Sequence, residues 1–571
     1  MRLRARLCLG LLVTGFALLA LQLYRIQVTD HQRYLDLARR QQVTYEVVPA
    51  RRGTIYDRKF RKLALTREVK SCFVSPVEVR DPAAVAGTLG QLLGVDAQGL
   101  RETIERRRER QFVWVKRHLS DRETARLEML DLPGVHLRTE RQRVYPGRTL
   151  ASHALGFTDI DGRGLEGLER RFDSLLTGSP GRRRLYRDGR RRCRPAGVRD
   201  EEPAQNGYDL VLTLDLAVQS IVEEELDRIM RQWGPRSATI IVAEVASGDV
   251  LALGNRPTFD PNQAGRWPAE ARLNRAVASA FEPGSVFKPF ALAAALEGGV
   301  LDLDDELFCH LGYYQPRRAL ALHDHKPFGW LTVREVVVRS SNIGMALVGE
   351  ATGAQRLYRM ARDFGFGERT GVELSGEVAG TLYPPSRWNP TSLTRIPMGH
   401  EVSVTALQLL TAFNAIANDG VLVPARVVRA VMDRDRGVGR RLEPPPGRRV
   451  LTPAVARTML REVLADVVRE GTGRQARLTT YQVAGKTGTA QKLVDGSYSH
   501  TRFVSSFLCA APVERPRISV LVTVDEPTAG PSYYGSTVAA PSAARVVEET
   551  LLYLQVPPQA LRLAQRRPEE P

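Results

Sequence analysis

An uncharged and mostly apolar run of 17 residues extends from Leu7 to Leu23, directly after the basic segment Met1 to Arg6. As a helix this run would span roughly 25 Å, a little less than the ~30 Å hydrocarbon core of a bilayer. No A-x-A cleavage pattern follows it, so we expect an uncleaved anchor over residues 7–24 rather than a signal peptide. The arginines before the run predict a cytoplasmic stub at residues 1–6 and an exported body.

Alternation and helical periodicity predict elements further along the chain. Leu210 to Leu214 alternates weakly as a strand, Asp215 is a good helix cap, and residues 217–230 carry apolar positions at helical spacing. Residues 238–253 are typical of two strands joined by a hairpin turn at Ala246 to Asp249. Further strands are predicted at 483–491, 503–510 and 518–524, and a closing helix is predicted at 542–554.

Length and composition divide the chain into blocks. At 571 residues and 63.5 kDa the chain is too long for one hydrophobic core, so two or three domains are expected. Residues 25–205 mix short strands and helices and end in an arginine-rich stretch, which predicts a pedestal domain whose charged end is a solvated loop. The second block covers residues 206–556, and residues 557–571 form a polar tail.

The net charge of +18 and the pI near 10.0 leave three explanations: nucleic-acid binding, attraction to anionic lipid, or a general preference for arginine. We favour the third, because an exported chain meets no nucleic acid and the basic residues are scattered. The cysteines show neither CxxC nor metal-ligand spacing, so isolated thiols are expected, although a disulfide among the four outside the anchor stays open. They are Cys8, Cys72, Cys193, Cys309 and Cys509.

Three short strings carry the candidate chemistry: SVFK at 285–288, SSN at 340–342 and KTGT at 486–489. A serine hydroxyl needs a positioned base to act as a nucleophile, and a side chain three residues along a helix comes alongside it. Lys288 can therefore reach Ser285. The preceding residues suit a turn, which places Ser285 at a helix N-terminus, where free backbone N–H groups favour negative charge.

The lysines in these strings stand out because the chain has only eight lysines among its 82 basic residues. Arginine stays protonated at ordinary pH, whereas an amine can be tuned, so a lysine in an arginine-rich chain indicates proton chemistry. Lys288 has to lose its proton to act as a base, and burial and a second cation both promote that loss. Lys486 is the candidate second cation. A lone SxxK has little specificity, but SxxK, SxN and KTG in this order form a known signature set.

Longer strings surround these motifs. They are RGTIYDR at 52–58, GLEGLE at 164–169 and VAGKTGTAQ at 483–491. With them the chain resembles, almost end to end, the penicillin-binding proteins and more narrowly the class B monofunctional peptidoglycan D,D-transpeptidases. The flanks NRA, FEPG, VDEP and YYG, which begin at Asn274, Phe281, Val524 and Tyr533, look most like the division (septal) and sporulation branch.

The resemblance implies an α+β fold. Its transpeptidase domain is of the penicillin-binding or serine β-lactamase-like kind, with an antiparallel five-stranded sheet flanked by helices and an all-helical subdomain. An N-terminal pedestal domain of the dimerisation type and a single transmembrane helix would precede it. The catalytic domain would lie on the periplasmic or extracytoplasmic side of the cytoplasmic membrane.

The resemblance also implies the reaction. Ser285 would attack the carbonyl of the penultimate D-alanine of a stem peptide, with Lys288 as base, and the terminal D-alanine would leave. Ser340 would relay the proton to the leaving amine, while Asn342 would bond Lys288 and the substrate amide. An amine of a second stem peptide would then take the acyl group.

The KTGT strand would bind the substrate. Lys486, Thr487 and Thr489 would face the terminal carboxylate, and Gly488 belongs to the run of small residues that lets a ligand backbone pair with the strand. Backbone N–H groups of Ser285 and Thr489 would form the oxyanion hole. A β-lactam would trap the serine, and no metal or cofactor is expected.

Some positions depart from the family pattern. Lys59-Phe60 stands where the family has asparagine-glycine, Val286 replaces threonine, His400-Glu401 interrupts a glycine-rich loop, and Ala406 replaces proline. His323, Asp324 and His325 invite a metal or triad reading, but a structural or substrate-cleft role is favoured. Glu166 and Glu169 are interpreted as a pedestal feature rather than an acid and base pair.

Four functions stay open. The first is a septal transpeptidase that works beside a membrane-embedded SEDS-type glycan polymerase and other divisome proteins, since no glycosyltransferase module is recognised before the catalytic block. The second is its elongation-type relative. A β-lactam-hydrolysing or β-lactam-sensing protein would need a deacylating group or a cytoplasmic signalling module. A non-enzymatic scaffold of a wall-building complex would not need to acylate.

Overall fold

The computed structural model describes residues 2–187, 193–195, 201–317, 320–494 and 496–558. The chain divides into two compact units, residues 1–53 with 177–207 and residues 54–176 with 208–571. The arginine-rich stretch predicted as a solvated loop is strand where it is described, at Gly181–Arg187 and Cys193–Pro195, so that prediction is wrong for these residues. The rest of the stretch and almost all of the predicted polar tail fall outside the described residues.

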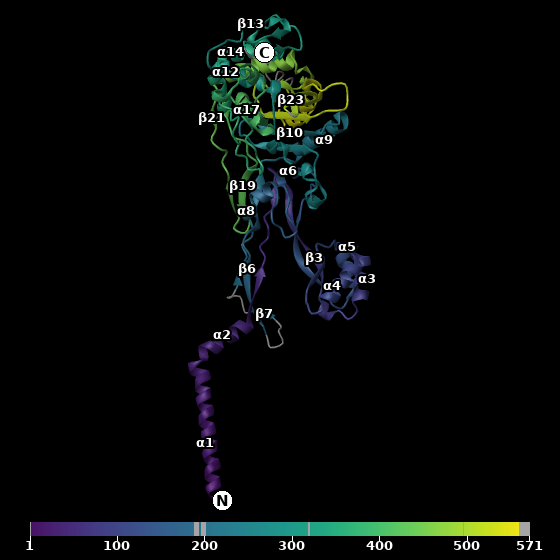
Figure 1. The fold of residues 1–571 in the computed structure, drawn as a ribbon, viewed down its shortest axis with the longest axis vertical. Helices are drawn as coiled ribbons and strands as arrows, with labels where there is room; N and C mark the ends of the chain where they lie inside the picture. The colour runs from purple at the N-terminus through teal and green to yellow at the C-terminus, as the bar shows by residue number, and fades with distance from the viewer. Residues whose placement is uncertain (1, 188–192, 196–200, 318–319, 495, 559–571) are drawn as a thin grey trace, which may run out of the picture. The chain divides into compact units, whose positions relative to one another are not determined.

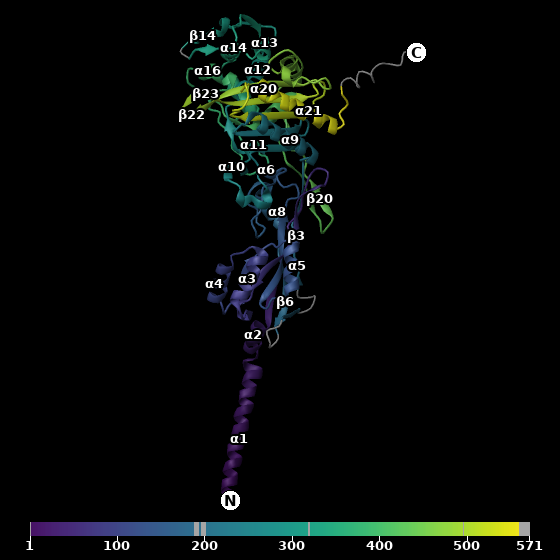
Figure 2. The ribbon, with the colours of Figure 1, turned by 90° about the vertical axis from the view of Figure 1, so that its right-hand side faces the viewer.

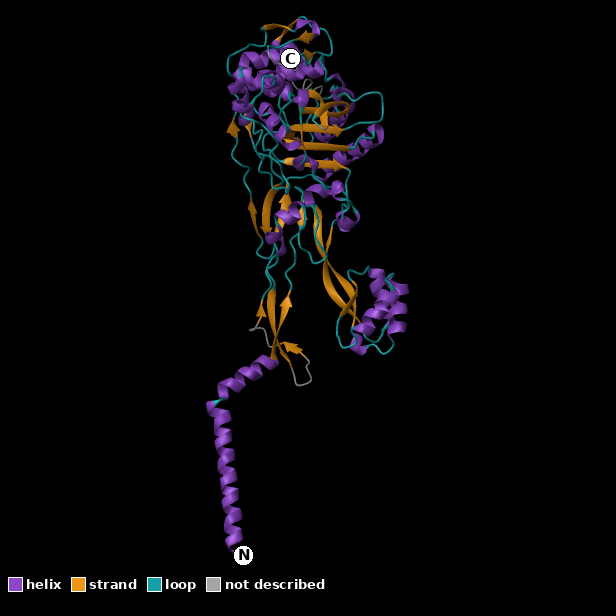
Figure 3. Cartoon of the chain, in the orientation of Figure 1, coloured by secondary structure: helices purple, strands orange, loops and turns teal. Residues whose placement is uncertain are grey.

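The first unit begins with the apolar helix. Helix α1 covers Arg2–Tyr24 and continues as a π-helix over Arg25–Thr29, and this helix is long and apolar enough to cross a membrane. Figure 3 shows α1 followed by a second helix, α2 His31–Gln42. A small antiparallel sheet completes the unit in the order β1-β6-β7, with β8 also paired to β6. Its strands are β1 Val43–Val48, β6 Gly181–Arg187, β7 Cys193–Pro195 and β8 Glu201–Glu202.

The second unit starts with strands that join its N-terminal part to the rest. A seven-stranded sheet has the order β20-β19-β9-β2-β3-β4, with β5 paired to β3. Strand β2 runs parallel to β9, with Ile55 opposite Leu210. The strands are β2 Ile55–Tyr56, β3 Lys62–Val74, β4 Val113–Lys116, β5 Val135–Val144, β9 Asp209–Leu212, β19 Val428–Asp433 and β20 Val438–Arg441. Helices α3 Pro82–Leu93, α4 Ala97–Arg106 and α5 Asp121–Leu130 share a separate apolar cluster with β3.

The turn between β2 and β3 replaces the family's asparagine-glycine. Asp57 accepts hydrogen bonds from the backbone N–H groups of Lys59 and Arg61, each at 2.8 Å, and from the Arg61 guanidinium at 2.6 Å. Phe60 takes the left-handed conformation, with φ of 61°, that glycine adopts more easily. The turn therefore places a residue with a side chain in a conformation that strains it. Glu169 is buried and pairs with Arg143 at 2.7 Å, which agrees with a structural role for that glutamate.

A five-stranded antiparallel sheet lies at the centre of the catalytic part, in the order β11-β10-β24-β23-β22. This confirms the predicted sheet, and β22 is one of its edges. The strands are β10 Ser237–Glu244, β11 Val250–Arg256, β22 Ala484–Val494, β23 Ser497–Ala511 and β24 Ile518–Asp525. Helices α9 Leu216–Trp233 and α21 Ala540–Tyr553 cover one face of the sheet (Figure 2). Asp215 caps α9 as predicted, accepting from the Ala217 N–H at 3.1 Å.

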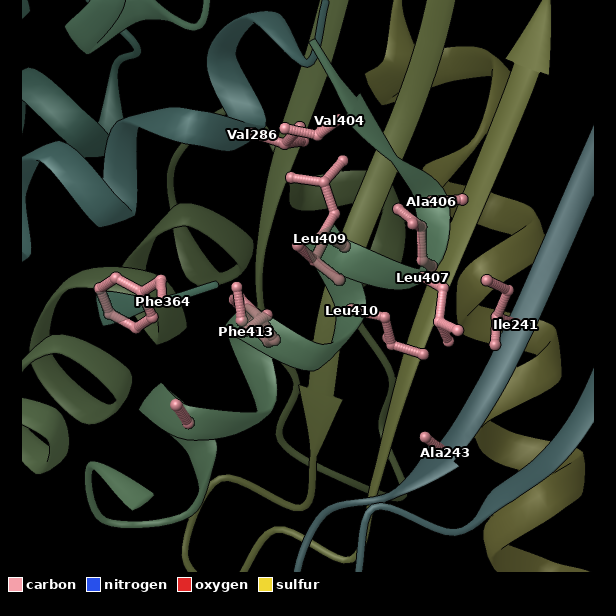
Figure 4. Packing of buried hydrophobic residues seen from close by; sticks show 14 of the residues in the cluster. Ile241, Ala243, Val286, Phe364, Val404, Ala406, Leu407, Leu409, Leu410 and Phe413 are labelled. Atoms are coloured by element: carbon pink, nitrogen blue, oxygen red, sulfur yellow. The ribbon is translucent and has the colours of Figure 1, made fainter. Parts of the chain in front are cut away.

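The opposite face carries the larger core. Helix α17 Ala406–Ala417 is completely buried and packs on this face. Figure 4 shows its side chains between Ile241 and Ala243 of β10 and Phe364 of the helical subdomain. The subdomain helices are α12 Lys288–Glu297, α13 Val333–Val338, α14 Asn342–Thr352, α15 Ala354–Asp363, α16 Ser392–Arg395, α18 Pro453–Thr458 and α19 Ala465–Arg469. Figure 1 labels α12 and α14 of this group.

Short two-stranded pairings accompany these helices, which an all-helical insert does not predict. They are β12 Ala280–Phe281 with β17 Val404–Thr405, β13 Glu306–Phe308 with β16 Trp330–Thr332, β14 Tyr313–Tyr314 with β15 Leu322–His323, and β18 Val421–Leu422 with β21 Arg448–Arg449. Among the described residues the remaining short α-helices are α6 Ser152–Leu155, α7 Gly167–Arg171, α8 Asp173–Thr177, α10 Ala269–Arg272, α11 Arg275–Ala278 and α20 Gly535–Val538. Cys72, Cys309 and Cys509 are buried free thiols and Cys8 is an exposed one.

Candidate active site

Ser285 lies in a 3₁₀ turn, Gly284–Phe287, that leads directly into α12. The Lys288 N–H donates to the Ser285 carbonyl oxygen and closes this turn. Side chains three residues apart eclipse each other in a 3₁₀ turn, so Ser285 and Lys288 share one side of it. The sequence predicted an α-helix N-terminus here, and the tighter turn aligns the two side chains more closely. We call Gly284–Phe287 the serine turn.

The loop that contains Gly399 holds the serine turn in place. The Gly284 N–H donates to the Gly399 carbonyl oxygen at 3.1 Å. Both glycines have positive φ, 57° and 82°, and a Cβ on Gly399 would lie 2.2 Å from the Gly284 carbonyl oxygen. Only glycine at position 399 permits this approach. The Ser285 side chain is half-buried, and its hydroxyl has no hydrogen-bond partner in the part of the chain that the structure describes.

Lys288 is fully buried beneath the serine turn. Its Nζ donates to the Ser340 carbonyl oxygen at 2.7 Å, the Asn342 Oδ1 at 3.0 Å and the Ser341 carbonyl oxygen at 3.1 Å, and it lies 3.2 Å from the Ser340 Oγ. Burial lowers the pKa of the Lys288 ammonium to about 7, with the Asp324 charge acting in the opposite direction. The amine can therefore be neutral near neutral pH and accept a proton.

Lys486 approaches the same hydroxyl from the edge strand. Its Nζ donates to the Ser340 Oγ at 2.9 Å and to the Thr487 carbonyl oxygen at 3.1 Å. Burial, and after it the positive charge of Lys288, lower the pKa of Lys486 well below its ordinary value. Ser340 itself has a φ of 61°, an uncommon conformation for serine that turns its hydroxyl between the two amines. One hydroxyl thus connects two buried amines.

Asp324 fixes the segment that carries Asn342. The Ser341 hydroxyl donates to its carboxylate at 2.6 Å, and the backbone N–H groups of Asn342 and Ile343 donate to the same carboxylate. These N–H groups open α14, so the carboxylate acts as a helix cap. The Asn342 Nδ2 donates in turn to the His323 carbonyl oxygen at 3.2 Å. The Asp324 carboxylate therefore positions the start of α14. Among the described residues there is no cluster of three side chains that could hold a metal ion.

The KTGT string forms the edge strand β22 beside the serine turn. A Cβ on Gly488 would lie 2.9 Å from the Val286 Cγ1 and 3.2 Å from the Pro283 carbonyl oxygen. The Thr489 Oγ1 accepts from the Gly535 N–H at 3.0 Å, which ties α20 to β22. An edge strand offers unpaired backbone groups with which an extended peptide can pair.

The structure joins Lys288, Ser340, Asn342 and Lys486 by hydrogen bonds and places β22 beside the serine turn, and it adds residues that the sequence did not reveal. The Thr472 and Thr487 hydroxyls are 2.7 Å apart, so Thr472 orients a side chain of the KTGT string. Gly535 supports Thr489 as described above. Thr472 has no sequence signal, because it acts through a contact across the fold, whereas Gly535 belongs to the YYG flank, which does not itself indicate this supporting role. Asp324 was noticed in the sequence, but its helix-capping role was not.

This arrangement can perform nucleophilic acyl transfer. A hydroxyl on a tight turn, a buried amine of lowered pKa three residues later and a second hydroxyl bonded to two amines provide a nucleophile, a base and a proton relay. The edge strand provides a place for an extended peptide substrate.

Comparisons with known proteins agree with this chemistry. The chain matches the model of the "Penicillin binding protein transpeptidase domain" over residues 238–548 and that of the "Penicillin-binding Protein dimerisation domain" over residues 47–212. It is 30% identical over 565 residues to peptidoglycan D,D-transpeptidase FtsI of Escherichia coli (strain K12), covering 98% of this chain and 92% of that protein. It is 34% identical over 510 residues to stage V sporulation protein D of Bacillus subtilis (strain 168), covering 89% and 79%. The crystal structure of penicillin binding protein 3 from Mycobacterium tuberculosis, complexed with aztreonam, matches with a TM-score of 0.70 and 30% identity, covering 90% and 98% of the two chains.

Proposed function

Because this chain belongs to the class B penicillin-binding proteins, the peptidoglycan D,D-transpeptidases, we propose that Ser285 is the residue acylated by the donor stem peptide and that the protein cross-links wall at the division septum. The observation that supports acylation at Ser285 is the position of the Ser340 hydroxyl, which accepts hydrogen bonds from the amines of both Lys288 and Lys486. A serine enzyme needs such an arrangement because a proton has to pass from the nucleophile to the leaving group.

Acylation begins at the serine turn. The neutral Lys288 amine takes the proton from the Ser285 hydroxyl as the oxygen attacks the carbonyl carbon of the penultimate D-alanine. Three oxygen acceptors around Nζ, from Ser340, Ser341 and Asn342, stabilise the ammonium that forms. The lowered pKa of Lys288 supports this role, because a base works best with a pKa near the operating pH.

Departure of the terminal D-alanine needs a proton on its nitrogen. The Ser340 hydroxyl, bonded to both amines, delivers that proton and is reprotonated from the lysine side. The product is an ester between Ser285 and the donor peptide. An amine of a second stem peptide then attacks the ester, loses a proton through the same relay and frees the serine.

Substrate binding uses the edge strand. We assign Lys486, Thr487 and Thr489 to the terminal carboxylate, with Gly488 allowing the peptide backbone to approach β22. The backbone N–H groups of Ser285 and Thr489 form the oxyanion hole, where each donor is typically worth about 3 kcal/mol. β-Lactams react at the same serine because they present an acylating carbonyl in the place of the D-alanyl peptide bond.

Mass spectrometry of the intact protein tests the assignment of Ser285. After incubation with benzylpenicillin the wild-type protein should gain the mass of one penicilloyl group, and Ser285→Ala should gain none. Ser386→Ala is the matched control, since Ser386 is an exposed serine outside the site and its loss should leave labelling unchanged. Full labelling of Ser285→Ala, or none of the wild type, contradicts the proposal.

We further propose a single-pass protein of the cytoplasmic membrane, with α1 as the anchor and the catalytic domain outside. The expected boundaries stay as proposed: stub 1–6, anchor 7–24, pedestal 25–205, transpeptidase 206–556 and tail 557–571. The flanking strings at Asn274, Phe281, Val524 and Tyr533 support the division and sporulation branch, and one relative is named as a sporulation protein. The expected partners are a SEDS-type polymerase and divisome proteins.

Fluorescence microscopy distinguishes the septal role from its elongation-type alternative. A tagged copy expressed at native level should gather at midcell before constriction, and a SEDS-type polymerase should co-purify with it. The acylation-dead Ser285→Ala copy serves as a control for whether location depends on activity. Uniform labelling of the side wall would support the elongation role and contradict the septal one.

A further inference from the structure

Glu282 lies three residues before Ser285 and joins three separate segments of the chain. Its Oε1 accepts from the Glu401 N–H at 3.0 Å and from the Tyr498 hydroxyl at 3.2 Å. Its Oε2 lies 3.1 Å from the His400 Nδ1, and this contact is a hydrogen bond when Nδ1 carries the proton. Glu282 precedes the serine turn in the chain, and its carboxylate thus joins that segment to the loop after Gly399 and to strand β23.

Each of these segments forms part of the surroundings of the nucleophile. The loop contributes Gly399, whose carbonyl oxygen holds the Gly284 N–H. Tyr498 lies near the start of β23, opposite Leu493 at the far end of β22. The carboxylate therefore connects the serine turn with the hairpin formed by β22 and β23.

Packing around the carboxylate restricts its partners. The His400 and Tyr498 rings meet edge to face, with centroids 5.3 Å apart and planes at 80°. The side chains of Glu282 and His400 are only 21% and 20% exposed, so water competes weakly for their hydrogen bonds. Burial and then the Glu282 charge raise the pKa of Tyr498, so its hydroxyl keeps the proton that it donates.

The loop is held in a conformation that it would not adopt alone. Glu401 has a φ of 58°, which is uncommon for a residue with a side chain. Its carboxylate accepts from the Thr391 hydroxyl at 2.9 Å and the Ser392 hydroxyl at 2.5 Å. Backbone in such a region persists where the surroundings over-determine it. His400 and Glu401 are also the residues that interrupt the glycine-rich loop of the family.

We propose that Glu282, His400 and Tyr498 form a clasp that positions β22 beside Ser285, so that the bound carbonyl meets the nucleophile in reactive alignment. The three are positioning residues, because they act through the serine turn and the hairpin. This inference rests on the proposed acylation of Ser285. It gives the family departure at His400 a function in the reaction.

The clasp should affect the acylation step more than the initial binding. The substrate strand can bind a ligand through its own backbone and the KTGT side chains, which the clasp does not touch. Acylation depends on the distance and angle between Ser285 and the carbonyl, and a misplacement of about 1 Å can cost ~100-fold in rate. Loosening the clasp therefore lowers the acylation rate constant and leaves the dissociation constant of the first complex nearly unchanged.

Stopped-flow acylation by a fluorescent penicillin separates the two constants in the full-length protein in detergent. Glu282→Gln, His400→Leu and Tyr498→Phe should each lower the acylation rate constant by about fivefold to fiftyfold, with the dissociation constant within about twofold of the wild type. His400→Asn should restore most of the rate, because the asparagine Nδ2 occupies the place of the histidine Nδ1. The double variant Glu282→Gln with Tyr498→Phe should lose less than the product of the single losses.

Tyr383→Phe is the matched control, because Tyr383 is exposed and lies outside the clasp. It should acylate at the wild-type rate. Unchanged rate constants in the clasp variants overturn the proposal. So does a loss that His400→Asn shares fully with His400→Leu, or one explained by a smaller folded fraction in melting curves. If the wild type itself is not acylated, the proposed function fails instead, and that outcome is seen before any variant is compared.

Discussion

Lys288 is the residue whose burial has the clearest consequence for activity. Its ammonium loses the hydration that it has in the unfolded chain, and the pKa falls to about 7. Below that pH the side chain is protonated and cannot accept the Ser285 proton. Above that pH the amine is neutral and can accept a proton, so we expect the acylation rate to rise with pH.

This sign gives a direct prediction for the pH profile. The rate constant for penicillin acylation should rise about tenfold between pH 6 and pH 8 and level off, with one ionisation near pH 7. The measurement is stopped-flow acylation in buffers of constant ionic strength. Lys288→Arg should be inactive throughout, because its guanidinium stays protonated. A rate that does not change between pH 6 and pH 8 contradicts the assignment of Lys288 as base.

Asp324 allows a second prediction, in which the charge of its carboxylate affects the pH midpoint and its hydrogen bonds affect the maximal acylation rate. Its negative charge favours the protonated form of Lys288, so Asp324→Asn should move the midpoint of the pH profile below that of the wild type. The amide also weakens the cap on α14, which carries Asn342, so the maximal rate should fall by about tenfold. Both constants come from the same stopped-flow series. A midpoint that moves to higher pH would contradict the electrostatic argument.

At the scale of elements, the helix α20 packs closely against strand β22. The Gly535 N–H donates to the Thr489 Oγ1, and a Cβ at Gly535 would lie 2.2 Å from the Gly488 carbonyl oxygen. A backbone oxygen so close cannot be avoided by a side-chain rotation, so β22 or α20 has to move. The position of the KTGT string therefore depends on a glycine outside it.

Gly535→Ala should slow penicillin acylation by at least about tenfold while the protein still folds, because the displaced strand is at the edge of the sheet. The control is Gly265→Ala, where a Cβ meets nothing within 4 Å and no positive φ is required. Acylation kinetics together with thermal melting decide the matter. Equal rates for Gly535→Ala and Gly265→Ala would show that α20 does not position β22.

Elements with a strong local pattern could be predicted from the sequence, and those fixed by distant contacts could not. The cap at Asp215 and the apolar spacing after it locate α9, and alternation locates the strands of the central sheet. The pairing of Ala280 and Phe281 with β17 has no pattern of its own, because two residues carry no period.

The same division applies to the site. Ser285, Lys288 and the two later strings are recognisable because their spacing and order are unusual. Asp324 and Thr472 are not, since a carboxylate beside histidines or a threonine among small residues has many ordinary roles. Their function depends on which backbone and hydroxyl groups the fold brings within hydrogen-bond distance.

At the scale of the whole molecule, the contacts that build the site all lie within the second unit. The serine turn, α14, β22 and α20 belong to residues 54–176 and 208–571. The helix that is long and apolar enough to span a membrane covers Arg2–Thr29 and belongs to the first unit. The proposed anchor and the proposed active site therefore belong to different units of the chain.

Deleting residues 1–29 should separate the two properties. The full-length protein should sediment with membranes and resist extraction by high salt, because an apolar helix inside a bilayer is held by the hydrophobic effect, which salt does not screen. The deletion variant should appear in the soluble fraction and acylate with penicillin at a rate within about twofold of the full-length protein, since none of the site's hydrogen bonds is lost. Charge alone predicts a different result: if the excess of arginine held the protein to anionic lipid, high salt would release the full-length chain as well. Release by salt would contradict the anchor, whereas a soluble deletion variant that cannot be acylated would contradict the independence of the catalytic unit.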